Sequence, residues 1–392
     1  MFSAAFRPFF LLAGCWSALA VPLWLGAYAM GLALPSALPP VVWHVHEMVF
    51  GFGFAAVAGF LLTAIPNWTG RLPLRGAPLA ALALLWLAGR AAVLLSALTG
   101  ALAAALADLA FPVALIAVVA RELVAGRNWR NLPMLAGLSL LFAGSLLVHL
   151  HALDVAYLAG AGNRLGIATL LMLIALVGGR IVPSFTRNWL ARARPGGALP
   201  AQAGKLDAAA LAATLIGLAS WVADPQGAAT PWLTLAAGFA LALRLSRWCG
   251  LATLREPLLL VLHAGYGWLA FGLLLLGLNG FVPILPQTSA LHALTIGAIG
   301  TMTLAVMTRA TLGHSGRPLA AGRGTTAIYL LVTLAALLRL AAPLSDGLVL
   351  PLTWMAGAAW SAAFGLFVVL YGDLLTRPPA TQSFSSPRMV ST

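Results

Sequence analysis

The sequence predicts an all-α polytopic membrane protein with about twelve transmembrane helices. Hydrophobic residues make up 61% of the 392-residue chain and charged residues only 8%, and the mean hydropathy is +0.98. A soluble domain carries about 25% charged residues, so this chain has too little polar surface to cover a globule in water. Apolar runs of about 18 or more residues, long enough to cross a bilayer, recur from one end of the chain to the other.

Loops marked by Pro and Gly separate these runs. The first run is too long for a signal peptide and lacks a small-x-small cleavage site followed by a soluble chain. We expect residues 1–376 to form a single bundle, and the polar, Pro- and Ser-rich residues 377–392 to form a disordered cytoplasmic tail. The twelve predicted spans are 9–31, 44–65, 78–97, 101–120, 132–152, 163–184, 206–224, 231–249, 257–277, 288–308, 325–343 and 349–371.

The basic residues that give the chain its net charge of +13 are concentrated in particular loops. Nearly all Lys and Arg residues precede the first span or follow an even-numbered span, from Arg7 to Arg388. By the positive-inside rule, both termini and these basic loops are cytoplasmic. The charge therefore orients the chain in a lipid bilayer, and we expect no nucleic-acid partner.

Five of the seven histidines are predicted to lie at the outer end of the bundle, opposite the basic loops. They open span 2, close span 5 and open span 10: His44, His46, His149, His151 and His292. His263 lies about two turns into span 9 from the cytoplasmic side. A single histidine at a helix end is usually interfacial, but ionisable residues inside membranes are costly and usually functional. Neutral imidazole suits haem iron, copper and zinc, so all six are predicted metal ligands.

The spacing within each His-x-His pair predicts separate roles for its members. At about 100° per residue, His44 and His46 point to nearly opposite faces of a helix. Glu47 shares a face with His44, which suits a carboxylate that orients a metal-bound imidazole, and Asp154 follows His151 by the same three residues. Each pair could serve two sites, or one member of each could hydrogen-bond at the membrane interface.

Three arginines are predicted to hold anionic groups such as haem propionates, because the Arg fork matches a carboxylate. Arg90 and Arg339 lie at or above the membrane midplane, towards the histidine end, and Arg164 opens span 6. Asp108 reaches a depth similar to that of Arg90. A buried Arg90–Asp108 pair is therefore the simpler interpretation of these two residues.

Two further patterns appear in the predicted spans, one shared by spans 2, 6 and 10 and one in span 2 alone. These spans end in "IPNWTGR", "VPSFTRNW" and "VMTRATLGHSGR", which fits a three-fold repeat of four helices or a shared helix-end chemistry. Span 2 also carries a small-residue stripe of Gly51, Ala55 and Gly59, which would let either another helix or a flat macrocycle approach closely.

Three sequence blocks resemble the NnrS family: "FRPFFLLAG" at 6–14, "WHVHEMVFGFGFAAVAGFLLTAIPNWTGR" at 43–71 and "HALTIGAIGTMTLAVMTRATLGHSGRPL" at 292–319. The resemblance implies a twelve-span protein of the bacterial inner membrane, with a b-type haem and a copper, that acts in nitric oxide metabolism and nitrosative stress. It implies His44, His46, Glu47 and His292 as the leading site residues, without assigning either metal to a histidine. Because Cys15 and Cys249 form no CxxCH motif, any haem would be bound non-covalently.

We therefore expect a protein that binds or transforms nitric oxide or metal-nitrosyl species, with an electron donor that the sequence does not identify. One alternative is a transporter whose histidines line a substrate or metal pathway. A membrane scaffold with interfacial histidines is the other.

Overall fold

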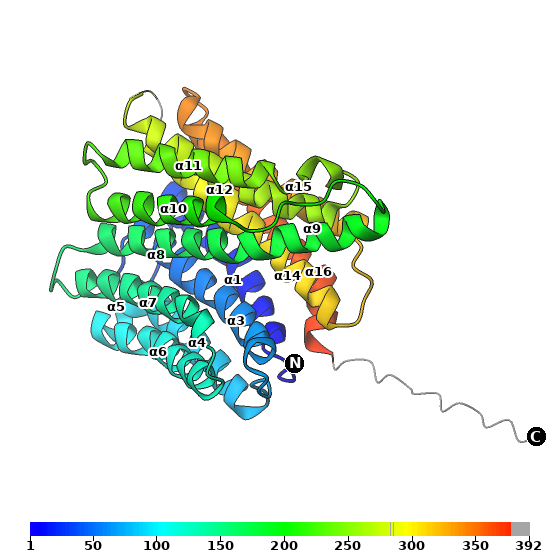
Figure 1. The fold of residues 1–392 in the computed structure, drawn as a ribbon. Coiled ribbons are helices and arrows are strands. Elements are labelled where there is room, and N and C mark those ends of the chain that lie inside the picture. The colour runs from blue at the N-terminus through cyan, green and yellow to red at the C-terminus, as the bar shows by residue number, and fades with distance from the viewer. Residues whose placement is uncertain (283, 285, 378–392) are drawn as a thin grey trace, which may run out of the picture.

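The chain folds, in a computed structural model, into a bundle of helices whose axes run roughly side by side (Figure 1). The structure describes residues 1–282, 284 and 286–377, so the predicted tail lies outside the described residues except for Arg377. Eleven helices in this part are long and apolar enough to cross a membrane. The prediction of an all-α polytopic membrane protein is confirmed.

The helices of the first half are α1 (Phe6–Met30), α2 (Pro40–His46), η1 (Glu47–Phe52), α3 (Gly53–Thr69), α4 (Ala77–Leu94), α5 (Ser96–Thr99), α6 (Ala101–Ala125), η2 (Trp129–Asn131), α7 (Leu132–Ala152), α8 (Ala159–Leu173), η3 (Ile174–Gly178) and α9 (Gly179–Ala193). Those of the second half are α10 (Lys205–Ala223), α11 (Thr230–Ser246), η4 (Gly250–Thr253), α12 (Pro257–Asn279), α13 (Gln287–His292), η5 (Ala293–Gly300), α14 (Thr301–His314), α15 (Arg323–Ala341), η6 (Ala342–Leu344) and α16 (Val349–Thr376).

The eighth predicted span, 231–249, is the one that the eleven do not include. It forms α11, a helix of 17 residues that ends before the left-handed backbone of Cys249, at φ 56°. Helix α11 nevertheless packs along α10 and α12 as the membrane-spanning helices do (Figure 1).

The amine of Met1 donates to the carbonyl of Thr376 at 3.1 Å, so the first and last described segments meet at the same end of the bundle.

Three of the long helices contain a π-helical segment. These are η1 between α2 and α3, η3 between α8 and α9, and η5 between α13 and α14, which lie in the second, sixth and tenth predicted spans. A π-helical turn shifts the register of the side chains that follow it and occurs frequently at functional sites. Two of the three begin directly after a histidine, His46 and His292.

Glycines let neighbouring helices touch backbone to backbone. The closest approach joins α7 and α8: a Cβ on Gly144 would lie 2.8 Å from the carbonyl oxygen of Gly162, and one on Gly162 would lie 2.6 Å from that of Gly144. In the predicted small-residue stripe, Gly59 receives the Phe10 ring of α1 and Gly51 lies under the side chains of Arg90 and Glu47. The stripe thus serves close packing of helices and side chains.

We predict that Gly144→Ala lowers the stability of the protein, because neither backbone can yield to the added methyl group. The expected loss is about 1–3 kcal/mol, the usual cost of overpacking a core. Thermal unfolding of the purified protein in detergent measures it. The matched control is Gly365→Ala in α16, where an added Cβ meets nothing within 4 Å. Equal stability of the two variants would contradict the close approach of α7 and α8.

Candidate metal centre

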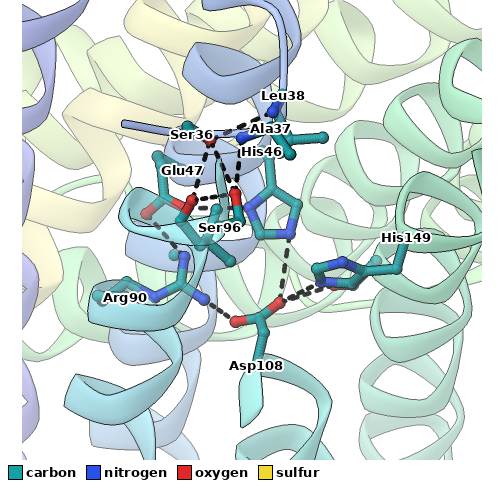
Figure 2. A network of polar contacts seen from close by, with 12 residues as sticks. Ser36, Ala37, Leu38, His46, Glu47, Arg90, Ser96, Asp108 and His149 are labelled. Atoms are coloured by element: carbon teal, nitrogen blue, oxygen red, sulfur yellow. Dashed lines mark hydrogen bonds and ion pairs between the residues drawn. The ribbon is translucent and has the colours of Figure 1, made fainter. Parts of the chain in front are cut away.

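Three buried side chains from three helices meet near one end of the bundle (Figure 2). His46 ends α2, Asp108 lies in α6 and His149 lies in the last turn of α7. One ligand atom from each lies within 4.8 Å of the other two. All three residues are less than 5% exposed, so the protein itself supplies their surroundings.

Arg90 of α4 connects this group to Glu47 of η1. Its Nη1 donates to Glu47 Oε2 at 2.7 Å and its Nη2 donates to Asp108 Oδ1. The guanidinium also lies over the Trp86 ring, and the indole of Trp86 donates to the carbonyl of Gly51 at 2.9 Å. The predicted Arg90–Asp108 pair is confirmed, and it is part of a larger network that ties η1, α4 and α6 together.

Glu47 determines which nitrogen of His46 carries the proton. Glu47 Oε1 lies 3.0 Å from His46 Nδ1, so the ring donates its Nδ1–H to the carboxylate and Nε2 keeps a lone pair. That Nε2 lies 3.3 Å from Asp108 Oδ2, is buried and has no hydrogen-bond partner among the described residues. When His46 is neutral, the lone pair of this nitrogen faces Asp108 Oδ2.

His149 lies at the same place. Its Nε2–H donates to Asp108 Oδ2 at 2.8 Å, and the two imidazole rings of His46 and His149 have centroids 5.1 Å apart. Ser145 Oγ also lies 3.4 Å from Asp108 Oδ2. Asp108 is thus the common neighbour of both histidines.

The charges of the cluster leave room for a cation. One guanidinium, Arg90, stands against the two carboxylates of Glu47 and Asp108, so the group carries one excess negative charge when both histidines are neutral. An unbalanced charge away from water is costly. Two imidazole nitrogens and a carboxylate oxygen form a donor set that suits copper or zinc, and Glu47 orients His46 as an outer carboxylate orients a metal-bound histidine. The residues present fit a metal ion.

The other member of the first His-x-His pair faces different neighbours. The His44 ring stacks on Trp24 of α1, with centroids 4.1 Å apart, and interacts electrostatically with His292 and Arg339. The Nδ1 of His44 and the Nε of Arg339 are buried without a hydrogen-bond partner in the described part of the chain. His292 Nδ1 lies 2.6 Å from the carbonyl of Thr288, which leaves its Nε2 as the acceptor. This second group contains two imidazoles and a guanidinium.

The remaining predicted site residues lie outside both groups. His151 packs against Tyr157, with ring centroids 5.7 Å apart, and Asp154 is an exposed loop residue with φ 55°. His263 Nε2 lies 2.9 Å from Thr186 Oγ1, and its helix enters from the opposite end of the bundle. Arg164 donates to the carbonyl of Val222 at 3.2 Å.

Sequence spacing paired Glu47 with His44, whereas its carboxylate contacts His46, and spacing did not place Asp108 beside the histidines. Helix periodicity places Glu47 three residues from His44, but its carboxylate turns back to the adjacent His46 because Arg90 holds it there. The similar depths of Arg90 and Asp108 were the available signal for Asp108. Its position beside His46 and His149 depends on how α6 packs against α2 and α7, which spacing alone does not reveal.

We predict that Arg90→Gln destabilises the protein strongly, because it leaves Glu47 and Asp108 buried without their shared cation. Breaking a buried ion pair in this way costs about 3–5 kcal/mol. The measurement is thermal unfolding, with Arg121→Gln as the control. Arg121 is 62% exposed in its pair with Glu122, and its removal is expected to cost at most about 1 kcal/mol. A loss for Arg90→Gln no larger than the control's would refute this account of the network.

Comparison with known proteins gives a family for the whole described bundle. No curated protein matches the chain. The family described as NnrS protein matches residues 1–378, which include the His46–Asp108–His149 cluster and the His44–His292 group. The chain belongs to the NnrS family.

Proposed function

We propose that this protein is a haem- and copper-binding protein of the bacterial inner membrane that binds or transforms nitric oxide and protects against nitrosative stress. The observation that carries the proposal is the buried cluster of His46, Asp108 and His149, with the unpartnered Nε2 of His46 aimed into it. Membership of the NnrS family supports it, because the haem, the copper and the link to nitric oxide come from that resemblance.

Copper is assigned to the His46–Asp108–His149 cluster. The nitrogen and oxygen donors match copper chemistry, and a cuprous ion would neutralise the single excess negative charge. When bound, copper supplies a one-electron couple. The chain's own residues hold it: Glu47 fixes the tautomer of His46, and Arg90 holds Glu47 and Asp108 in place.

Haem is assigned to the group of His44, His292 and Arg339. The imidazoles of His44 and His292 would hold the haem iron, and the Arg339 guanidinium, whose Nε is buried, would pair with a propionate. A cavity of about 860 Å³ is lined by Arg164 and by Val45 and Leu291, the chain neighbours of His44 and His292. Nitric oxide is small and apolar, so it can reach a site within the bundle through the lipid. His44 and His46 are separated by one residue, which would put the two centres close together.

The topology proposed here has twelve crossings, with α11 as the eighth and both termini in the cytoplasm. The contact between Met1 and Thr376 supports it, because an even number of crossings brings the two ends to one side. The basic loops give the orientation. The three π-helical segments, each in an equivalent span, support three units of four helices.

We predict that His46→Ala, His149→Ala and Asp108→Asn each abolish copper binding. Glu47→Gln should weaken it by roughly 10–100-fold, the usual effect of changing a residue that orients a metal-bound histidine. Copper is measured by elemental analysis of the purified protein. The control is His151→Ala, which removes the other histidine of the second His-x-His pair. This variant should retain copper. Copper at wild-type stoichiometry in all three ligand variants would exclude this site.

We predict that His44→Ala and His292→Ala shift or abolish the Soret band, while copper stays bound. Optical spectra and iron analysis after expression in a haem-replete host provide the measurement. A colourless wild-type protein without iron or copper would reject the redox function and favour a transporter. An anaerobic assay of nitric oxide consumption with a chemical reductant then separates turnover from binding.

A further inference from the structure

A second polar region lies at the opposite end of the helices that carry the metal cluster. A cavity of about 550 Å³ opens there between the ends of α3, α9 and α14. His46 lies near the start of the continuous helix Pro40–Thr69, whereas Asn67, which lines this cavity, lies near its other end. The charged or titratable side chains in its wall are Arg180, Arg309 and His314, and no Asp or Glu lines it.

The two arginines of this cavity lack carboxylate partners. Arg309 lies over the Phe185 ring at 4.3 Å, and Arg180 makes one long contact, 3.5 Å to the amide oxygen of Asn131. Neither forms an ion pair within residues 1–282, 284 and 286–377, although Glu256 acts on Arg309 at longer range. Arg90 and Arg244, by contrast, each bind a buried carboxylate. Guanidinium groups within the helical bundle that line a cavity and form no ion pair among the described residues favour an anionic ligand.

The basic cavity continues into a narrow apolar arm. The arm is about 100 Å³ and shares six wall residues with the basic cavity, among them Phe10, Phe60 and Val306. It extends between α3, η3 and the segment from η5 to α14, and Thr303 is the one polar side chain in its wall. A ligand that fills both parts needs a charged head and a slender apolar tail.

We propose that this basic cavity binds an anionic amphiphile, with a carboxylate or phosphate headgroup on Arg180 and Arg309 and an acyl chain in the apolar arm. A free single-chain acid and a membrane phospholipid share this chemistry. The site is separate from the metal cluster, so its occupancy and the copper content can be measured independently in one preparation.

The test uses the full-length protein in an uncharged maltoside detergent. Laurate, dodecyl phosphate, dodecanol and inorganic phosphate are titrated against thermal unfolding, and phosphatidylglycerol in mixed micelles forms a further arm. Laurate or dodecyl phosphate should raise the unfolding temperature and dodecanol and inorganic phosphate should not, because head and tail are both required. If phosphatidylglycerol is the only amphiphile that raises the unfolding temperature, the natural ligand is a membrane phospholipid. Equal shifts with dodecanol and laurate would overturn the proposal.

Variants locate the effect in the cavity. Arg180→Gln with Arg309→Gln should weaken the apparent affinity about tenfold or more, as the loss of charge-assisted hydrogen bonds requires. Arg309→Lys should retain most of it, and Arg75→Gln, an exposed loop residue, should change nothing. If the double variant does not fold, Ala56→Leu in the arm provides the second test, by shifting the preference from dodecyl to shorter chains. Undiminished binding in the double variant, or an unchanged chain-length preference in Ala56→Leu, would refute the site.

Discussion

The guanidinium of Arg90 holds together the end of the bundle where the candidate metal centre lies. A charge at membrane depth is costly unless it is paired, and Arg90 meets two carboxylates, Glu47 on η1 and Asp108 on α6. Each carboxylate in turn contacts a histidine. Because one cation serves both acids, the network carries a single negative charge in excess when both histidines are neutral. That excess favours the binding of a further cation.

The His-x-His spacing distributes two imidazoles to two environments from one short helix. Helix α2 ends at His46, and the π-helical segment η1 begins at the next residue. His46 turns towards α6 and α7, whereas His44 turns towards α1 and the group around His292. A rigid helix between two such groups keeps their separation constant. The second pair also separates its imidazoles: His149 contacts Asp108, whereas His151 lies near the end of α7, against Tyr157 of the following loop.

Sequence patterns could predict the helices, because twenty or so apolar residues in a row have few alternatives in a bilayer. They also separated His44 from His46, because that depends only on helix geometry. Sequence patterns did not predict that Glu47 contacts His46 or that Asp108 lies beside both histidines, since both depend on which helices are neighbours in space. The length of α11 was missed for a related reason: the helix ends at Ser246, before the left-handed backbone of Cys249, and no local pattern marks that end. Local periodicity therefore defines faces, whereas packing between helices defines sites.

The composition explains why the two ends of the bundle differ. The chain has nine acidic residues against 22 Lys and Arg, so carboxylates are the scarce partner. Buried acids are accordingly paired with arginine: Glu47 and Asp108 with Arg90, and Asp207 with Arg244. Most of the remaining arginines lie in loops, where water solvates them. Arg180 and Arg309 lie in helices, form no ion pair among the described residues, and both face a cavity. The buried cluster with two carboxylates to one guanidinium thus favours a cation, and the cavity lined by two guanidinium groups favours an anion.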